Sequence, residues 1–208
     1  NTPKTKKTTV NNVVKPKPKP KPTPKSGKNN VQNGGDAPKK GNVSVKEINK
    51  EIKNALGKDL IEIKTTNALS NKYESGIPIA LYLLELKLDS LNGFTKKGIL
   101  LPDYIKKNSH DTAYIIANYI IAFFSQLRQP LLMNVDQSIL MKAINKDAMA
   151  GVCKQINEPH SSVLIYLFDI CAKVASNDSR TGLGTEQLAR IFGPMTLLIT
   201  KKDVRGNR

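Results

Sequence analysis

An abrupt change of pattern near residue 42 constrains the fold of this chain more than any other feature. Between Lys15 and Lys25 lysine alternates almost strictly with proline. Proline removes backbone hydrogen-bond donors, and like charges on every second residue repel one another, so this stretch has no means of packing. We therefore expect residues 1–42 to be a disordered, basic, lysine- and proline-rich arm that extends about 3 Å per residue.

The rest of the chain has the apolar spacing of helices and no alternating strand pattern. Its first periodic residues are Ile48, Ile52 and Ala55, spaced by four and then three. Further helices are predicted over Ala80–Leu88, Asp111–Gln126, Asp136–Ala150, Ser161–Ala175 and Thr185–Phe192. At 39% hydrophobic residues the chain is long enough to bury a sizeable core. Residues 43–208 are thus predicted to form one all-α bundle of about seven to nine helices.

Several residues have the chemistry of helix starts. Ser44 is predicted to cap the first helix and to form a capping box with Glu47. Pro78 suits the first turn of the next helix, where its missing donor costs nothing. His110 and His160 lie beside two later helix starts and have no partner at catalytic or metal spacing. We interpret both histidines as part of those helix starts.

The sequence shows no metal, cofactor or membrane-spanning pattern. Cys153 and Cys171 lack C-x-x-C spacing and lie among apolar residues, which predicts two buried free thiols in a reducing cytoplasm. The longest apolar stretch, Ala113–Phe124, is too short to cross a bilayer. Since the chain opens on Asn1, we also expect it to be a piece of a longer protein.

Short blocks in a fixed order along the last three quarters of the chain resemble the RhoGAP domain family. The most specific block, with the pattern L-A-x-x-F-G-P, lies near the C-terminus and is preceded by a helix. The blocks are Ala55–Leu60, Gly76–Ile79, Phe94–Gly98, Ile120–Leu132 and Leu188–Pro194. The resemblance implies an all-α RhoGAP-like bundle that binds a Rho- or Rac-family small GTPase in signalling to the actin cytoskeleton.

The same resemblance places Thr95 where the family has its catalytic arginine finger. An activating protein inserts that arginine to neutralise charge on the transferring phosphate, which raises the rate about 10³- to 10⁵-fold. Threonine offers one neutral donor in place of a charged, planar fork. We therefore expect a RhoGAP domain that lacks the finger and acts as a binding module with little or no catalysis.

Other polar positions of the family also differ, while its apolar positions are kept. Ile121 and Ser125 stand where a lysine and an arginine are usual, and Thr181 and Gln187 stand at two asparagine positions. The GTPase-binding surface implied by the resemblance comprises Phe94, Thr95, Lys96, Lys97, Ile121, Ser125, Thr181, Gln187 and Pro194.

Other interpretations of the loop remain open. Lys96 or Lys97 would supply the missing charge in an unconventional but working activator, or both would form a solvated basic loop, or contact a partner or phosphate without catalysis. Even in the working case the chain would activate a GTPase and would not itself be the hydrolase. Arg128 and Arg180 are other cations in this region, and we interpret both as surface charges.

The arm predicts a second kind of partner. Residues 1–42 carry a net charge of +10, while the remaining 166 residues hold only +6. Each lysine near an anionic leaflet contributes about 1 kcal/mol, which favours recruitment to phosphoinositide-rich membrane at the cytoplasmic face of the plasma membrane. The candidate lipid-binding residues are Lys15, Lys17, Lys19, Lys21 and Lys25. An inert solubilising linker is the alternative, whereas the absence of Trp and of any recognisable motif argues against nucleic acid.

Overall fold

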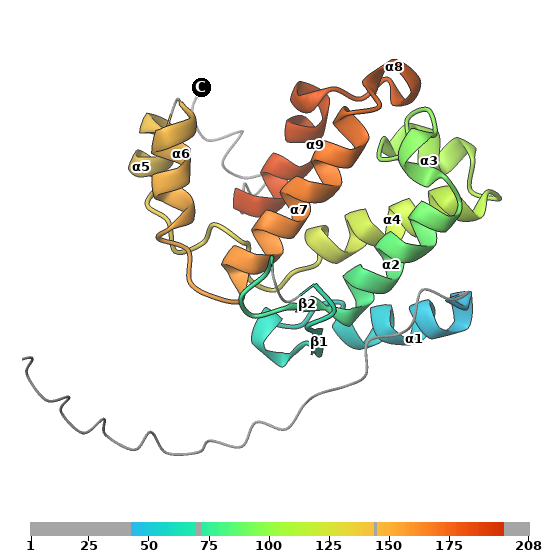
Figure 1. Cartoon of the computed structure of the whole chain (residues 1–208), viewed down its shortest axis with the longest axis horizontal. Helices are drawn as coiled ribbons and strands as arrows, with labels where there is room; N and C mark the ends of the chain where they lie inside the picture. The colour runs from blue at the N-terminus through green and yellow to red at the C-terminus, as the bar shows by residue number, and fades with distance from the viewer. Residues whose placement is uncertain (1–42, 70–71, 144, 198–208) are drawn as a thin grey trace, which may run out of the picture. The chain divides into compact units, whose positions relative to one another are not determined.

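The computed structural model describes residues 43–69, 72–143 and 145–197 (Figure 1). The predicted basic arm, residues 1–42, lies outside the described residues, as do its five candidate lipid-binding lysines. The boundary near residue 43 therefore stays a prediction.

The described residues are predominantly helical, which confirms the predicted all-α class. Nine α-helices lie within them: α1 (Val45–Ala55), α2 (Ile79–Ser90), α3 (Pro102–Lys107), α4 (Thr112–Ser125), α5 (Gln137–Lys142), α6 (Lys146–Cys153), α7 (His160–Ala175), α8 (Asp178–Thr181) and α9 (Thr185–Leu197). Two 3-10 turns, η1 (Leu60–Glu62) and η2 (Gly93–Thr95), and two short antiparallel strands, β1 (Thr65–Thr66) and β2 (Ile77–Pro78), complete the set.

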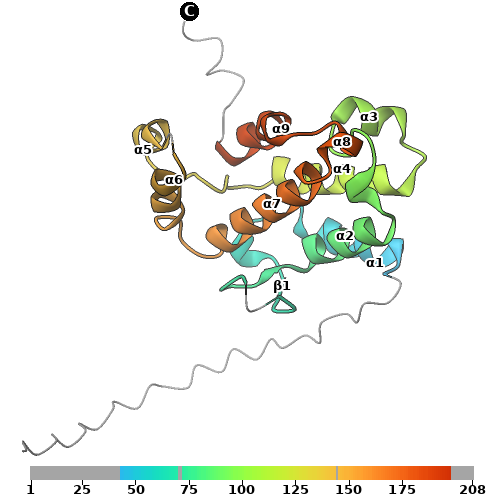
Figure 2. The same cartoon turned by 45° about the horizontal axis from the view of Figure 1, so that its top comes forward.

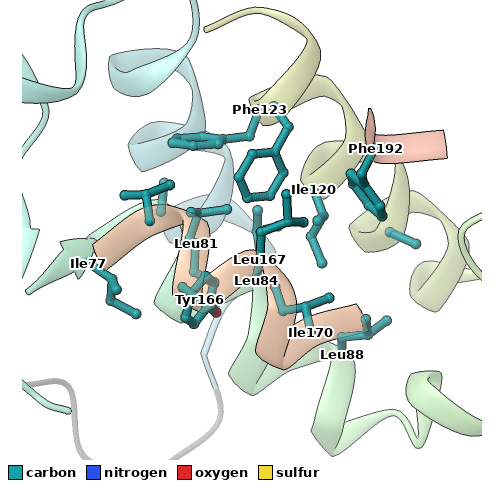
Figure 3. Packing of buried hydrophobic residues seen from close by; sticks show 14 of the residues in the cluster. Ile77, Leu81, Leu84, Leu88, Ile120, Phe123, Tyr166, Leu167, Ile170 and Phe192 are labelled. Carbon is teal, nitrogen blue, oxygen red and sulfur yellow. Dashed lines mark hydrogen bonds between the residues drawn. The ribbon is translucent and has the colours of Figure 1, made fainter. Parts of the chain in front are cut away.

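The core forms where α2 and α4 pack against each other and are covered by α1, α7 and α9 (Figures 1 and 2). Side chains of α2, α4, α7 and α9 pack together in one cluster, as Figure 3 shows. Phe124 meets Phe123 and Phe192 edge to face, with ring centroids 5.4 and 5.8 Å apart. Each fully buried side chain of this kind stabilises the fold by about 1.5–3 kcal/mol. No helix of the described residues is long and apolar enough to cross a membrane.

The predicted helix starts are largely observed. The Ser44 hydroxyl accepts a hydrogen bond from the Glu47 amide at 3.2 Å. Asp111 caps α4, because its carboxylate accepts from the Ala113 amide at 2.9 Å. Pro78 differs from the prediction by one position. It is the residue before α2 and pairs with Thr65 in the small sheet, instead of lying in the first helical turn.

The structure corrects two predicted helices. The single helix predicted over Asp136–Ala150 is two helices, α5 and α6. The second one restarts at Asn145, whose side chain accepts from the Ala148 amide at 2.9 Å, so the asparagine acts as a new N-cap. Helix α9 runs past its predicted end to Leu197 with Pro194 inside it. Pro194 is exposed, so water can solvate the backbone carbonyl that proline leaves without a donor.

Candidate functional site

The segment between α2 and α3 forms a tight loop, which we call the α2–α3 loop and define as residues 92–98. Asn92 and Gly98 have positive φ angles of 52° and 62°. A Cβ on Gly98 would lie 2.4 Å from the ring of Tyr104, and one on Gly93 would lie 2.2 Å from Leu88. Only glycine fits either position, so the path of the loop is set by close backbone approach.

Three contacts that do not involve Thr95 anchor this loop. The side chain of Phe94 is only 6% exposed and packs in the core. The Gly98 amide donates to the Thr181 carbonyl at 2.7 Å, and the Tyr114 hydroxyl donates to the Lys97 carbonyl at 2.6 Å. Within the loop, η2 packs against α2, α4, α7 and α8. The loop is therefore held from several sides.

The three residues at the tip of the loop differ in what they contact. The Thr95 hydroxyl donates to the Asn92 carbonyl at 2.9 Å, within the loop itself. The Lys96 ammonium lies 2.5 Å from the Asp111 carboxylate at the start of α4. This hydrogen bond lowers the pKa of Asp111. The Lys97 side chain is exposed and forms no ion pair with any described residue. Of the three side chains, that of Lys97 is the best placed to meet a partner.

Helix α4 presents a face without charge. No charged residue occurs between Asp111 and Arg128. Ile121 is half-buried, and the exposed Ser125 donates its hydroxyl to the Ala122 carbonyl at 3.1 Å. At 1.5 Å per residue, Asp111 and Ser125 lie about 21 Å apart along the helix. Lys96, through Asp111, and Ser125 therefore lie near opposite ends of a helix that carries no charge.

Burial corrects two residues of the predicted partner surface. Phe94 and Thr181 are 6% and 1% exposed, so neither side chain can touch a partner in this conformation. The Thr181 hydroxyl instead lies 3.4 Å from the Val174 carbonyl and accepts from the Leu183 amide at 3.2 Å. Both residues support the α2–α3 loop from its buried side. Gln187 and Pro194 are exposed on α9 and remain available to a partner.

The other singled-out residues lie outside this surface or on its margins. Arg128 and Arg180 are exposed, as surface charges should be, and Arg128 lies 3.8 Å from Asp59. His110 precedes the cap of α4, and His160 is the first residue of α7. Burial lowers the pKa of His160. The described residues contain no cluster of ligands that would hold a metal ion.

A separate apolar cavity of about 390 Å³ opens between α6, α7 and α9. No charged side chain lines it, and the lining includes Cys153, Leu164, Phe168, Cys171, Leu188 and Phe192. The two cysteines are free, as predicted, but they are half-buried against the core and not fully buried. Burial raises the pKa of Cys171 to about 11. Neither thiol is therefore set up as a nucleophile.

These features define a helical domain in which an anchored loop with two lysines, Lys96 and Lys97, lies beside a helix without charged residues. The family model of the RhoGAP domain matches residues 94–202, more than half of the chain. The chain belongs to the RhoGAP domain family. Domains of this family bind and regulate Rho-family small GTPases, so Rho-family signalling is the setting of this chain.

A solved structure with the same fold is the crystal structure of human Rho GTPase activating protein 15. It matches with a TM-score of 0.53 and 18% sequence identity over 76% of this chain and 85% of that chain. At that identity the likeness shows the fold alone. No curated protein matches the sequence.

Proposed function

We propose that this domain binds a Rho- or Rac-type GTPase without markedly accelerating GTP hydrolysis. The observation that carries the proposal is the state of the α2–α3 loop. The side chain of Thr95 bonds to the backbone of its own loop, and the ammonium of Lys96 is held by Asp111. Neither side chain extends a cation toward a nucleotide.

The contacts of Thr95 and Lys96 matter because GTP hydrolysis needs a cation near the phosphate. Charge accumulates on the phosphate oxygens in the transition state, and a finger arginine lowers the barrier by about 4–7 kcal/mol. A threonine hydroxyl that already donates to a carbonyl has no donor left for a phosphate oxygen. Binding to the GTPase does not need the finger, because a fixed loop and a neutral helix already offer a surface.

The proposed contact surface combines exposed and half-buried residues near the two ends of α4. On the loop side it includes Thr95, Lys96 and Lys97, and at the other end Ile121 and Ser125. From α9 it adds Gln187 and Pro194.

A working activator is the second candidate, and the exposure of Lys97 favours it. The Lys97 ammonium forms no ion pair with any described residue, and the Tyr114 hydroxyl donates a hydrogen bond to the Lys97 backbone carbonyl. Lysine is nonetheless a point charge on a flexible stem and does not reproduce the bidentate geometry of arginine. Lys96 would first have to leave Asp111.

Single-turnover GTP hydrolysis distinguishes the binding domain from the working activator. A panel of Rho-family GTPases is assayed with the wild-type domain and with the Lys96→Ala and Lys97→Ala variants. We expect stimulation below about tenfold in every case, together with binding to the GTP-analogue form. Stimulation above tenfold that disappears in one lysine variant would establish the activator instead.

We further propose that the arm recruits the domain to phosphoinositide-containing cytoplasmic membrane. The net charge of +10 within residues 1–42 supports this, since polybasic segments are attracted to anionic lipid. Co-sedimentation with liposomes containing phosphoinositide is compared for the chain with and without those residues. Binding that is unchanged by the truncation, or insensitive to salt, would contradict the proposal.

A further inference from the structure

A partly buried ion pair lies directly beneath the α2–α3 loop. Glu85 on α2 and Lys173 on α7 are 88 residues apart in sequence, yet their charged groups are in contact. The Glu85 side chain is only 13% exposed, and the Lys173 side chain is 47% exposed. The pair therefore joins the helix that leads into the loop to a helix from the other end of the domain.

The same lysine also contacts the loop. The Lys173 ammonium lies 5.4 Å from the centre of the Phe94 ring, within the range of a cation–π interaction. Phe94 is the buried anchor of the loop and immediately precedes Thr95. Lys173 is thus the one described cation that contacts both α2 and the anchor of the loop.

A buried tyrosine fixes the carboxylate that holds this lysine. The Tyr166 hydroxyl lies 2.6 Å from the second carboxylate oxygen of Glu85 and 3.0 Å from the Leu81 carbonyl. Tyr166 is 1% exposed and packs edge to face on Tyr73 at 5.7 Å. Since a fully buried ring has little freedom, the position of Glu85 is set by the core itself, and Glu85 in turn sets the position of Lys173.

Packing alone does not require this arrangement. Buried apolar residues of both helices, including Leu88 of α2 and Ile170 and Val174 of α7, already belong to one hydrophobic cluster. Burying a carboxylate is costly unless it is paired, and apolar replacements of such pairs are often neutral for stability. A charge pair that adds little stability but fixes a geometry is suited to positioning.

We infer that Lys173 is a positioning residue of the α2–α3 loop, which it holds in the partner-binding conformation through Phe94 and the Glu85–Tyr166 pair. The inference rests on the proposed function in assuming that this loop contacts the GTPase. It goes beyond that function in assigning the orientation of the loop to residues outside the loop.

The test measures the loop first and binding second. The Lys96 and Gly98 amides donate to Gly93 and Thr181 in the folded loop, so their hydrogen exchange followed by NMR reports the loop conformation. Lys173→Met keeps an unbranched stem of nearly the same length and removes the charge, whereas Lys173→Arg keeps the charge. Lys154→Met, at an exposed lysine after α6, is the matched control.

We expect Lys173→Met to speed exchange at both amides at least fivefold and to weaken GTPase binding about tenfold. Lys173→Arg restores both, because guanidinium pairs with carboxylate and stacks on aromatic rings. Adding Glu85→Gln to Lys173→Met removes the unpaired carboxylate but does not restore the contact with Phe94, so exchange at both amides stays fast. Lys154→Met leaves both readouts unchanged.

If Lys173→Met does not change the hydrogen exchange of the Lys96 and Gly98 amides, the inference is overturned, whatever happens to GTPase binding. Failure of Lys173→Arg to restore exchange would do the same, because only the packing of the lysine stem would then matter. If the wild-type domain binds no Rho-family GTPase while loop exchange responds as expected, the positioning role stands and the proposed function fails.

Discussion

Replacing Thr95 by arginine tests the proposed loss of catalysis most directly. The loop around Thr95 is anchored by Phe94, Gly98 and the Tyr114 hydroxyl, and none of these contacts involves the Thr95 side chain. The substitution removes one hydrogen bond, from the Thr95 hydroxyl to the Asn92 carbonyl. At about 0.5–1 kcal/mol this lowers Tm by no more than roughly 4 °C.

The gain in rate follows from the same geometry. A complete finger accelerates hydrolysis about 10³- to 10⁵-fold. Under the alignment implied by the family resemblance, α4 would support the finger but is uncharged between Asp111 and Arg128, and Gln187 would replace an asparagine. A displacement of 1 Å costs about 10²-fold, so Thr95→Arg is expected to raise the rate about ten- to thousandfold.

The assay is single-turnover hydrolysis with the GTPase that binds the wild-type domain most tightly. Lys96→Arg and Lys97→Arg are matched controls, since they place the same guanidinium one or two residues further along the loop. Stimulation by Lys97→Arg and not by Thr95→Arg would show that position 97 is the finger position. Absence of stimulation in a folded, GTPase-binding Thr95→Arg variant would refute the reasoning that the missing finger cation is the main reason for the lack of catalysis.

Three further predictions concern the stability and chemistry of the domain. Gly98→Ala places a Cβ against an aromatic ring at positive φ and should destabilise by about 2–4 kcal/mol, measured by denaturant unfolding. Its control is Gly57→Ala, at positive φ but with open space around it, which should lower the free energy of unfolding by only about 1–2 kcal/mol. Asp111→Asn keeps the cap of α4 and releases Lys96. Tm should fall by less than about 4 °C while hydrolysis stays unstimulated, and clear stimulation would show that the ion pair had masked a working lysine. With its pKa raised to about 11, Cys171 should be only about 0.1% thiolate at pH 8. Its alkylation, measured by mass spectrometry, should therefore be far slower in the native than in the unfolded protein.

Much of the fold could be predicted because its helices carry local signals. The predicted range Asp111–Gln126 agrees with α4 to one residue at each end, since an aspartate caps its start. The division of α5 from α6 depends on whether Asn145 acts as a cap or as an ordinary helical residue, and periodicity cannot decide that. The two-residue strands β1 and β2 are too short to show any alternation.

The candidate site was less predictable, because its decisive contacts join residues far apart in sequence. The pairing of Lys96 with Asp111 spans 15 residues, and that of Lys173 with Glu85 spans 88. Helical spacing places such residues on faces but does not say which faces meet. The burial of Phe94 could have been inferred from its size and apolar character, which favour a role beneath the loop over one on its surface.

The anchoring of the α2–α3 loop also bears on how such chains change over evolutionary time. Because Thr95 is not what gives the loop its shape, threonine and arginine can be exchanged there without unfolding the domain. Under the proposed function, such an exchange would change hydrolytic stimulation and leave partner recognition in place. Gly98 cannot be exchanged in this way, and mutational scanning should find far fewer tolerated substitutions at Gly98 than at Thr95.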